Sequence, residues 1–315
     1  MSPWIEFVRA YDPLPWILGM VLGAGVLSVA LHYAACALFP RMGLLDFPER
    51  YGITRKRLPY PIGLVFAVLS IATICLMGPI LTISPGVLCI VLALLTVVCV
   101  IDDRWQLPVS VRLGMQILLA FVLFAYGTRI YTIQNPLSDF LGGDILPLDR
   151  VTMDTALFGS LPLWSGVVTM AWLLLTMNAM NWFDGIPGQV SVLSVIAFAT
   201  LGLLALLPHV AQPDVAQLSL ILAGIAIGSA VFTFPQPKAI LGDTGAMTMG
   251  LLIGILAMAS GGKVATAFLV LGVPLIDSFL VIVRRIIKRT SPLKGNARDE
   301  HLHHRLLRAG WSEKQ

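Results

Sequence analysis

The stretch GVLCIVLALLTVVCVI, residues 86–101, runs directly into Asp102-Asp103-Arg104. It contains no charged residue and approaches the length of about 20 apolar residues that crosses a bilayer. Two adjacent carboxylates then stand at its end. Because ionisable groups at the ends of membrane segments are candidates for function, this stretch predicts a membrane helix that leads to an acidic site.

The rest of the chain has the same character. Of its 315 residues, 57% are hydrophobic and 12% are charged, whereas soluble domains carry about 25% charged residues. We therefore predict an all-α fold, a polytopic membrane bundle of about nine transmembrane helices that uses residues 1–315 as a single domain. The eight further segments are Trp16–Phe39, Pro61–Ile83, Val111–Gly127, Leu161–Met177, Val190–Leu207, Leu218–Phe234, Ala246–Ser260 and Val264–Ile287.

Lysine and arginine predict the orientation. With nine crossings, only four of the 21 basic residues fall on one side, namely Arg9, Arg129, Arg150 and Lys263. Basic loops stay in the cytoplasm, so we expect the N-terminus outside and the other face in the cytoplasm, in the inner (cytoplasmic) membrane. Residues 128–160 then form an external loop, with room for a short hairpin, and residues 284–315 form a cytoplasmic C-terminal segment.

Four polar motifs end apolar segments on the predicted cytoplasmic face. They are Asp102-Asp103, the stretch from Asn178 to Gly188 with Asn181 and Asp184, Gly242-Asp243-Thr244-Gly245, and His301-Leu302-His303-His304 with Arg305. Carboxylates and imidazoles that converge on one face predict a metal-dependent site for a charged or lipid-borne substrate.

Each motif also has a plainer interpretation. Two carboxylates at a helix C-terminus oppose the helix dipole, but Arg104 and Arg112 can balance them. Asn, Asp and Gly form ordinary turns, and a Gly-Asp-Thr sequence is a common helix start. The basic loop that contains Arg57 follows from the orientation alone, and attraction of a lipid phosphate is an additional role for it.

The four cysteines, Cys36, Cys75, Cys89 and Cys99, all lie inside apolar segments, and no two form a Cys-x-x-Cys pair. We expect them to be small packing residues that form neither a disulfide nor a zinc site.

Taken in order, the motifs resemble one known family. A basic loop, Asp-Asp-Arg, Asn-Ala-x-Asn-x-x-Asp-Gly, Gly-Asp-Thr-Gly and His-x-His-His are similar to the motifs of the polyprenyl-phosphate N-acetylhexosamine-1-phosphate transferases. That superfamily also contains the phospho-MurNAc-pentapeptide translocase. The His-Leu-His-His motif followed by Arg305 resembles the GlcNAc-1-phosphate branch more closely.

The resemblance implies a reaction and its site. A UDP-sugar, with GlcNAc as the expected sugar, gives its sugar-1-phosphate to undecaprenyl phosphate, and UMP is released. Mg²⁺, with Mn²⁺ as a substitute, is the implied cofactor, and the implied partners are the donor, the lipid and the membrane, with a homodimer as a further expectation and no nucleic acid. The implied catalytic residues and metal ligands are Asp102, Asp103 and Asp243, and the implied substrate-binding residues are Asn181, Asp184, Arg57, His301, His303, His304 and Arg305.

Two positions depart from the family pattern, and three other functions stay open. Pro187 replaces an acidic residue, and Ile240 replaces an aromatic residue; both positions are associated with the uracil ring. The first alternative is the pentapeptide translocase. The second is a transporter whose carboxylates couple to ions, and the third is a non-catalytic family member.

Overall fold

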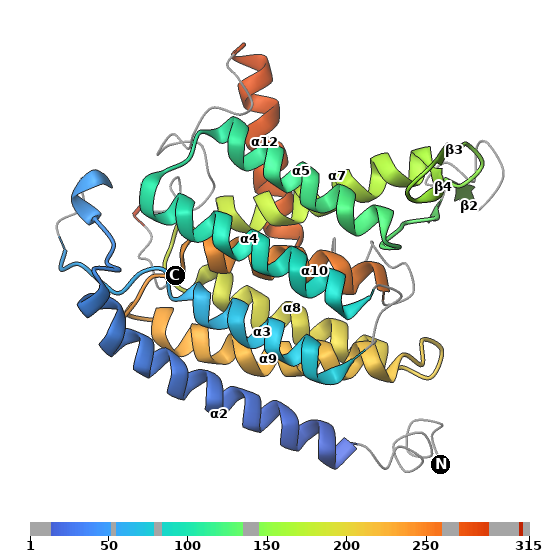
Figure 1. Cartoon of the computed structure of the whole chain (residues 1–315). Helices are drawn as coiled ribbons and strands as arrows, with labels where there is room; N and C mark the ends of the chain where they lie inside the picture. The colour runs from blue at the N-terminus through green and yellow to red at the C-terminus, as the bar shows by residue number, and fades with distance from the viewer. Residues whose placement is uncertain are drawn as a thin grey trace.

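The computed structural model describes residues 14–51, 55–78, 84–134, 145–259, 271–289 and 309–310. Over these residues the chain is an α-helical bundle with two small β-hairpins at one side (Figure 1). Each of the nine predicted apolar segments contains an α-helix. The helices are α2 (Leu14–Leu38), α3 (Gly63–Met77), α4 (Pro85–Trp105), α5 (Val109–Ala125), α7 (Leu163–Phe183), α8 (Gln189–Ala205), α9 (Pro213–Thr233), α10 (Gly242–Ala259) and α12 (Gly272–Ile287).

The helices place the protein in the multi-pass membrane class. Among the described residues, five helical stretches are long and apolar enough to cross a membrane, and three further apolar helices are shorter. The prediction of a polytopic helical membrane protein is therefore confirmed. Nine crossings and their orientation stay predictions. The five stretches are Pro15–Met42, Pro85–Trp105, Leu163–Phe183, Pro213–Thr233 and Gly242–Ala259.

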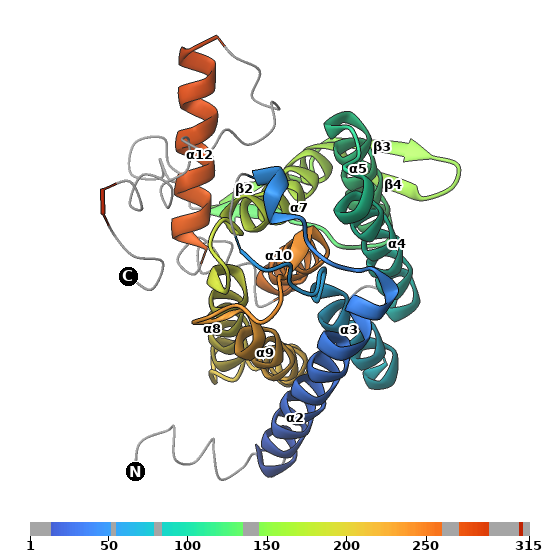
Figure 2. The same ribbon diagram turned by 90° about the vertical axis from the view of Figure 1, so that its left-hand side faces the viewer.

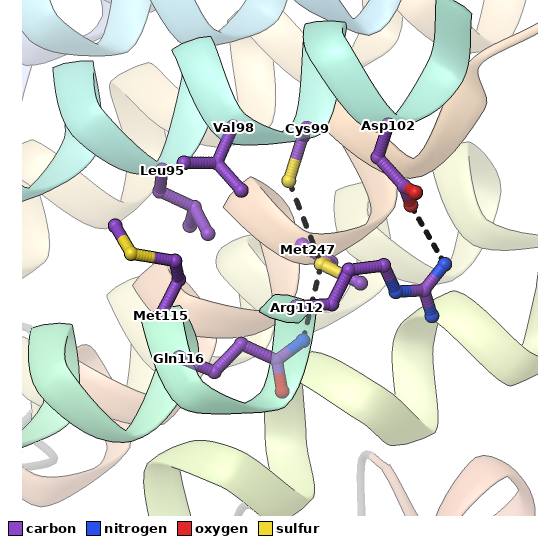
Figure 3. A pocket seen from close by; sticks show the side chains of 8 residues that line it. All are labelled: Leu95, Val98, Cys99, Asp102, Arg112, Met115, Gln116 and Met247. Carbon is purple, nitrogen blue, oxygen red and sulfur yellow. Dashed lines mark hydrogen bonds and ion pairs between the residues drawn. The ribbon is translucent and has the colours of Figure 1, made fainter. Parts of the chain in front are cut away.

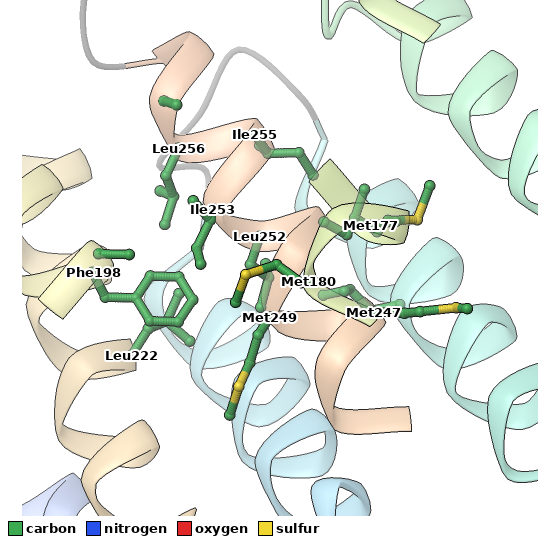
Figure 4. Close-up of a cluster of buried hydrophobic side chains, with 14 of the residues drawn as sticks. Met177, Met180, Phe198, Leu222, Met247, Met249, Leu252, Ile253, Ile255 and Leu256 are labelled. Atoms are coloured by element: carbon green, nitrogen blue, oxygen red, sulfur yellow. The ribbon is translucent and has the colours of Figure 1, made fainter. Parts of the chain in front are cut away.

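Helix α10 is the centre of the bundle. It packs against α3, α4, α7 and α8, and Figure 2 shows it enclosed by them. Small residues let α7 approach closely, as is usual between membrane helices. A Cβ on Gly250 would lie 2.6 Å from the Thr176 carbonyl oxygen, and one on Gly254 would lie 2.6 Å from its hydroxyl. Large apolar side chains from α7, α8, α9 and α10 fill the remaining space (Figure 4).

The segment between α5 and α7, predicted to be external, contains two hairpins, where the sequence suggested room for one. Strand β1 (Thr132–Gln134) pairs antiparallel with β2 (Ile145–Pro147). Strand β3 (Thr152–Thr155) pairs antiparallel with β4 (Gly159–Pro162) and leads into α7. These hairpins cap one end of α5 and α7, away from the acidic motifs (Figure 1).

Among the described residues the polar motifs lie at helix ends, as the sequence predicted for Asp102 and Asp103. Asp102 and Asp103 belong to α4, and Asp243 lies in the first turn of α10. The prediction that the stretch from Met177 to Gly188 forms a turn was wrong for its first half, because α7 continues to Phe183. The helix continues there because its polar side chains find partners on α5 and α10, as described below.

Candidate active site

The first turn of α10 lies against the start of α3 and the end of α4. Gly242 has φ +81°, a backbone conformation that favours glycine, and a Cβ at this position would lie 2.6 Å from Cβ of Pro61. Gly63 and Gly245 also touch, since a Cβ on Gly63 would lie 2.3 Å from the Gly245 backbone. These glycines therefore allow the contact that brings Asp243 beside Asp102 and Asp103.

Asp103 caps helix α10 from the neighbouring helix. Its Oδ1 accepts hydrogen bonds from the Tyr60 hydroxyl (2.5 Å) and the Asp243 N–H (2.9 Å). Its Oδ2 accepts from the Thr244 N–H (3.2 Å) and the Thr244 hydroxyl (2.6 Å). A carboxylate has about four acceptor positions, so Asp103 is fully engaged. It satisfies two helix-start N–H groups that an N-cap residue usually serves.

Asp102 and Asp243 converge on a single nitrogen atom. Asp102 is buried, and its Oδ1 accepts from the Leu107 N–H at 2.7 Å. Nη1 of Arg112, on α5, lies 2.7 Å from Oδ2 of Asp102 and 3.0 Å from Oδ2 of Asp243. Figure 3 shows the Arg112 guanidinium facing the Asp102 carboxylate across the gap between α4 and α5. Asn181 donates to the same Asp243 oxygen at 3.2 Å.

Negative charge exceeds positive charge at this point. Burial and, secondarily, the nearby charge of Asp103 raise the pKa of Asp184, which follows α7, to about 7, so Asp184 carries only part of a negative charge near neutral pH. Asp102, Asp103 and Asp243 lie together, and the Arg112 guanidinium binds two of them. Such an excess of carboxylates favours a divalent cation or a cationic group of a substrate.

The donor atoms fit Mg²⁺. This ion prefers oxygen ligands and is usually held by one or two carboxylates together with substrate phosphates and water. Asp102 and Asp243 offer two converging carboxylate oxygens that share Arg112 Nη1, whereas Asp103 accepts four hydrogen bonds from Tyr60 and the start of α10. Within the described part of the chain no group of three or more Asp, Glu, His and Cys side chains gathers as a metal site. A cation here would therefore take its remaining ligands from phosphate or water.

A small, mostly apolar crevice with room for about one water molecule adjoins this cluster. It lies between α4, α5 and α10, with Leu95, Val98 and Met115 on its walls and Asp102 and Arg112 at its polar end (Figure 3).

Sequence reasoning missed some residues of the site. Arg112 entered only as a balancing charge, and Tyr60 and Gln116 did not enter. The sequence did contain a signal for two of them, because Arg112 and Gln116 are a charged residue and an amide inside the otherwise apolar segment of α5. Asn178, which the motif groups with Asn181, turns away and donates to Gln116 Oε1 at 2.8 Å. It therefore ties α7 to α5 rather than contacting the carboxylates.

One predicted residue, Arg57, is not brought to the cluster. Arg57 donates to Glu49 at 3.1 Å and lies 4.7 Å over the Phe47 ring, so its contacts stay within its own loop. The histidine motif is outside the described residues. It comprises His301, His303, His304 and the neighbouring Arg305.

The amino-acid sequence matches a known protein family over the part of the chain that carries the site. The model of the family described as "Glycosyl transferase family 4" matches residues 85–261, more than half of the chain. That range includes Asp102, Arg112, Asn181 and Asp243.

Three relatives carry related names. A probable undecaprenyl-phosphate N-acetylglucosaminyl 1-phosphate transferase of Bacillus subtilis (strain 168) is 26% identical over 280 residues, covering 87% of this chain and 72% of the relative. A decaprenyl-phosphate N-acetylglucosaminephosphotransferase of Mycolicibacterium smegmatis is 30% identical over 257 residues, covering 74% and 59%. An undecaprenyl-phosphate alpha-N-acetylglucosaminyl 1-phosphate transferase of Yersinia pestis is 27% identical over 306 residues, covering 91% and 76%. The chain thus spans about three-fifths to three-quarters of the length of these relatives.

Proposed function

This chain belongs to glycosyl transferase family 4, and we propose that it transfers GlcNAc-1-phosphate from UDP-GlcNAc to undecaprenyl phosphate at the cytoplasmic face of the inner membrane. One observation carries the proposal. The Asp102 and Asp243 carboxylates, from α4 and α10, meet at Arg112 Nη1 on α5. The names of the relatives support both the polyprenyl-phosphate acceptor and the GlcNAc-1-phosphate group.

The reaction exchanges one bond to phosphorus for another. A phosphate oxygen of the lipid attacks the β-phosphorus of UDP-GlcNAc, and the bond from that phosphorus to the oxygen bridging to the α-phosphate breaks. The lipid gains GlcNAc-1-phosphate through a new diphosphate bond, and UMP leaves with the bridging oxygen. A phosphate monoester has a second pKa of about 6, so its oxygen is largely ionised at pH 7. The protein must mainly position the groups and offset their charge.

The described residues divide this work. Asp243 and Asp102 would hold Mg²⁺, which draws phosphate oxygens together and offsets their charge. Arg112 contacts both carboxylates, so it is placed to bind an oxygen of either phosphate. Asn181 orients Asp243 through its amide, and Asp184, close to them, is proposed to face the nucleotide-sugar.

Two features favour direct transfer without a phospho-enzyme. Asp103 accepts four hydrogen bonds, and Asp102 is bound on both of its oxygens. A carboxylate held in this way is a poor nucleophile, because each donor would have to be released before it attacks phosphorus.

An assay with two donors tests the proposal. We expect the purified full-length protein in detergent, with undecaprenyl phosphate and Mg²⁺, to make labelled lipid from UDP-GlcNAc but not from UDP-MurNAc-pentapeptide. EDTA should abolish the product, because the carboxylates then lack the cation that neutralises the phosphates, and added Mg²⁺ or Mn²⁺ should restore it. Product from the pentapeptide donor alone would contradict the assignment of the sugar. Equal product with EDTA would contradict the assignment of the metal.

A further inference from the structure

Two cysteines face each other at the end of the bundle remote from the acidic cluster. Cys75 lies in the last turn of α3 and Cys89 in the second turn of α4, and their Sγ atoms are 3.0 Å apart. The two helices pack side by side and are joined by a short connection (Figure 1). Both residues are free thiols in this structure. A disulfide bond is about 2.05 Å long, so a movement of about 1 Å would bring the sulfurs to bonding distance.

We propose that Cys75 and Cys89 form an intramolecular disulfide, a modification site that ties α3 to α4. The inference is independent of the transferase activity, because the pair lies far from the reacting groups. Cys89 and Asp102 are 13 positions apart on α4, which corresponds to about 20 Å along a helix at about 1.5 Å per residue.

The surroundings of the pair also favour oxidation. Leu76 is 87% exposed and Ile90 is 60% exposed, so this side of the hairpin forms an outer surface of the bundle. The connection 78–84 carries no charged residue, whereas the opposite end of α4 carries Arg104. By the distribution of basic residues this end is extracytoplasmic, where disulfides form and persist.

Oxidation of the two thiols to a disulfide needs an oxidant that reaches the membrane surface. Each thiol loses its hydrogen, the two sulfurs join, and two electrons and two protons pass to the oxidant. A lipid-soluble quinone is an acceptor of this class and leaves as the quinol. The other two thiols have different environments. Cys99 is buried at 3.5 Å from the sulfur of Met247 beside the active site, and Cys36 lies in α2.

Controlled oxidation of the purified full-length protein tests the proposal. Copper–phenanthroline in air serves as the probe, with oxygen taking the two electrons and two protons to form hydrogen peroxide. We expect two of the four thiols to be lost and a peptide linking Cys75 to Cys89 within one chain to be found by mass spectrometry. The Tm should rise and then return to its starting value with dithiothreitol, because the cross-link restricts the unfolded chain.

Single variants provide the matched controls. Cys75→Ser and Cys89→Ser should each lose both the cross-link and the rise in Tm, whereas Cys36→Ser should keep both. The proposal is overturned if Cys75 and Cys89 are both still alkylated after oxidation of the folded protein. It is also overturned if the cross-link joins two chains or involves Cys36.

Discussion

Asp243→Asn is expected to lower kcat/KM for UDP-GlcNAc roughly a thousandfold, the scale on which loss of one charged group acts in phosphoryl transfer. In the native protein, Oδ2 of Asp243 accepts hydrogen bonds from Arg112 Nη1 and Asn181 Nδ2. The substitution keeps the side-chain shape and the N–H group that donates to Asp103. Stability should therefore hardly change, and Tm should stay within a few degrees of the native value. Initial rates of labelled lipid formation, measured beside a thermal melt, check both expectations.

The chain contains a matched control for this change. Asp214 stands in the first turn of α9 just as Asp243 stands in the first turn of α10. It is exposed, and it lies at the end of α9 that the sequence predicts to be on the opposite side of the membrane. Asp214→Asn should leave kcat/KM unchanged. If Asp243→Asn kept more than a tenth of native activity, the central role of Asp243 would be lost.

Asp103→Ala is expected to lower the free energy of unfolding of the protein by more than Asp102→Asn does. The loss removes the oxygens that accept the Asp243 and Thr244 N–H groups at the start of α10. Losing a cap costs about 0.5–2 kcal/mol, and each buried donor left unpaired costs about 1–3 kcal/mol. We expect a loss of about 2–4 kcal/mol in the free energy of unfolding. Activity should fall as well, because the first turn of α10 carries Asp243.

A double-mutant cycle separates the cap from a chemical role. The Thr244 hydroxyl donates to Asp103, and Thr244→Ala removes this bond alone. The Asp103→Ala/Thr244→Ala variant should therefore be destabilised by less than the sum of the single variants, with a coupling of about 0.5–3 kcal/mol. Asp102→Asn, by comparison, should lose activity with a smaller change in stability. An Asp103→Ala protein that is as stable as the native chain and fully inactive would instead indicate a reacting carboxylate.

Hydropathy was enough to predict the helices. Each of the nine apolar segments contains one, and α4 and α10 meet at the acidic motifs as the resemblance implied. The helix ends could not be predicted, since they depend on partners far along the chain. Asn178 and Asn181 read as turn residues by propensity, yet Gln116 and Asp243 bind them and α7 continues.

The different roles of Asp102 and Asp103 have a simple geometric origin. Successive residues on an α-helix point about 100° apart, because a turn takes about 3.6 residues. Asp102 therefore faces Arg112 on α5, while Asp103 faces the start of α10. The sequence predicted a helix end for both residues, but the packing that separates their roles was hidden. The proximity of Cys75 and Cys89 was hidden for a related reason, since the apolar pattern does not set the register between α3 and α4.

Two labels on the donor test whether the β-phosphate is transferred together with the sugar. UDP-GlcNAc labelled with ³²P at the β-phosphate and ³H in the uridine is incubated with the protein, undecaprenyl phosphate and Mg²⁺. We expect ³²P in the lipid product and ³H in UMP, in equal amounts. Asp243→Asn should abolish the formation of both labelled products. Release of UDP carrying both labels would mean transfer of the sugar alone. That result would contradict attack at the β-phosphorus, and with it the roles assigned to Asp102, Arg112 and Asp243.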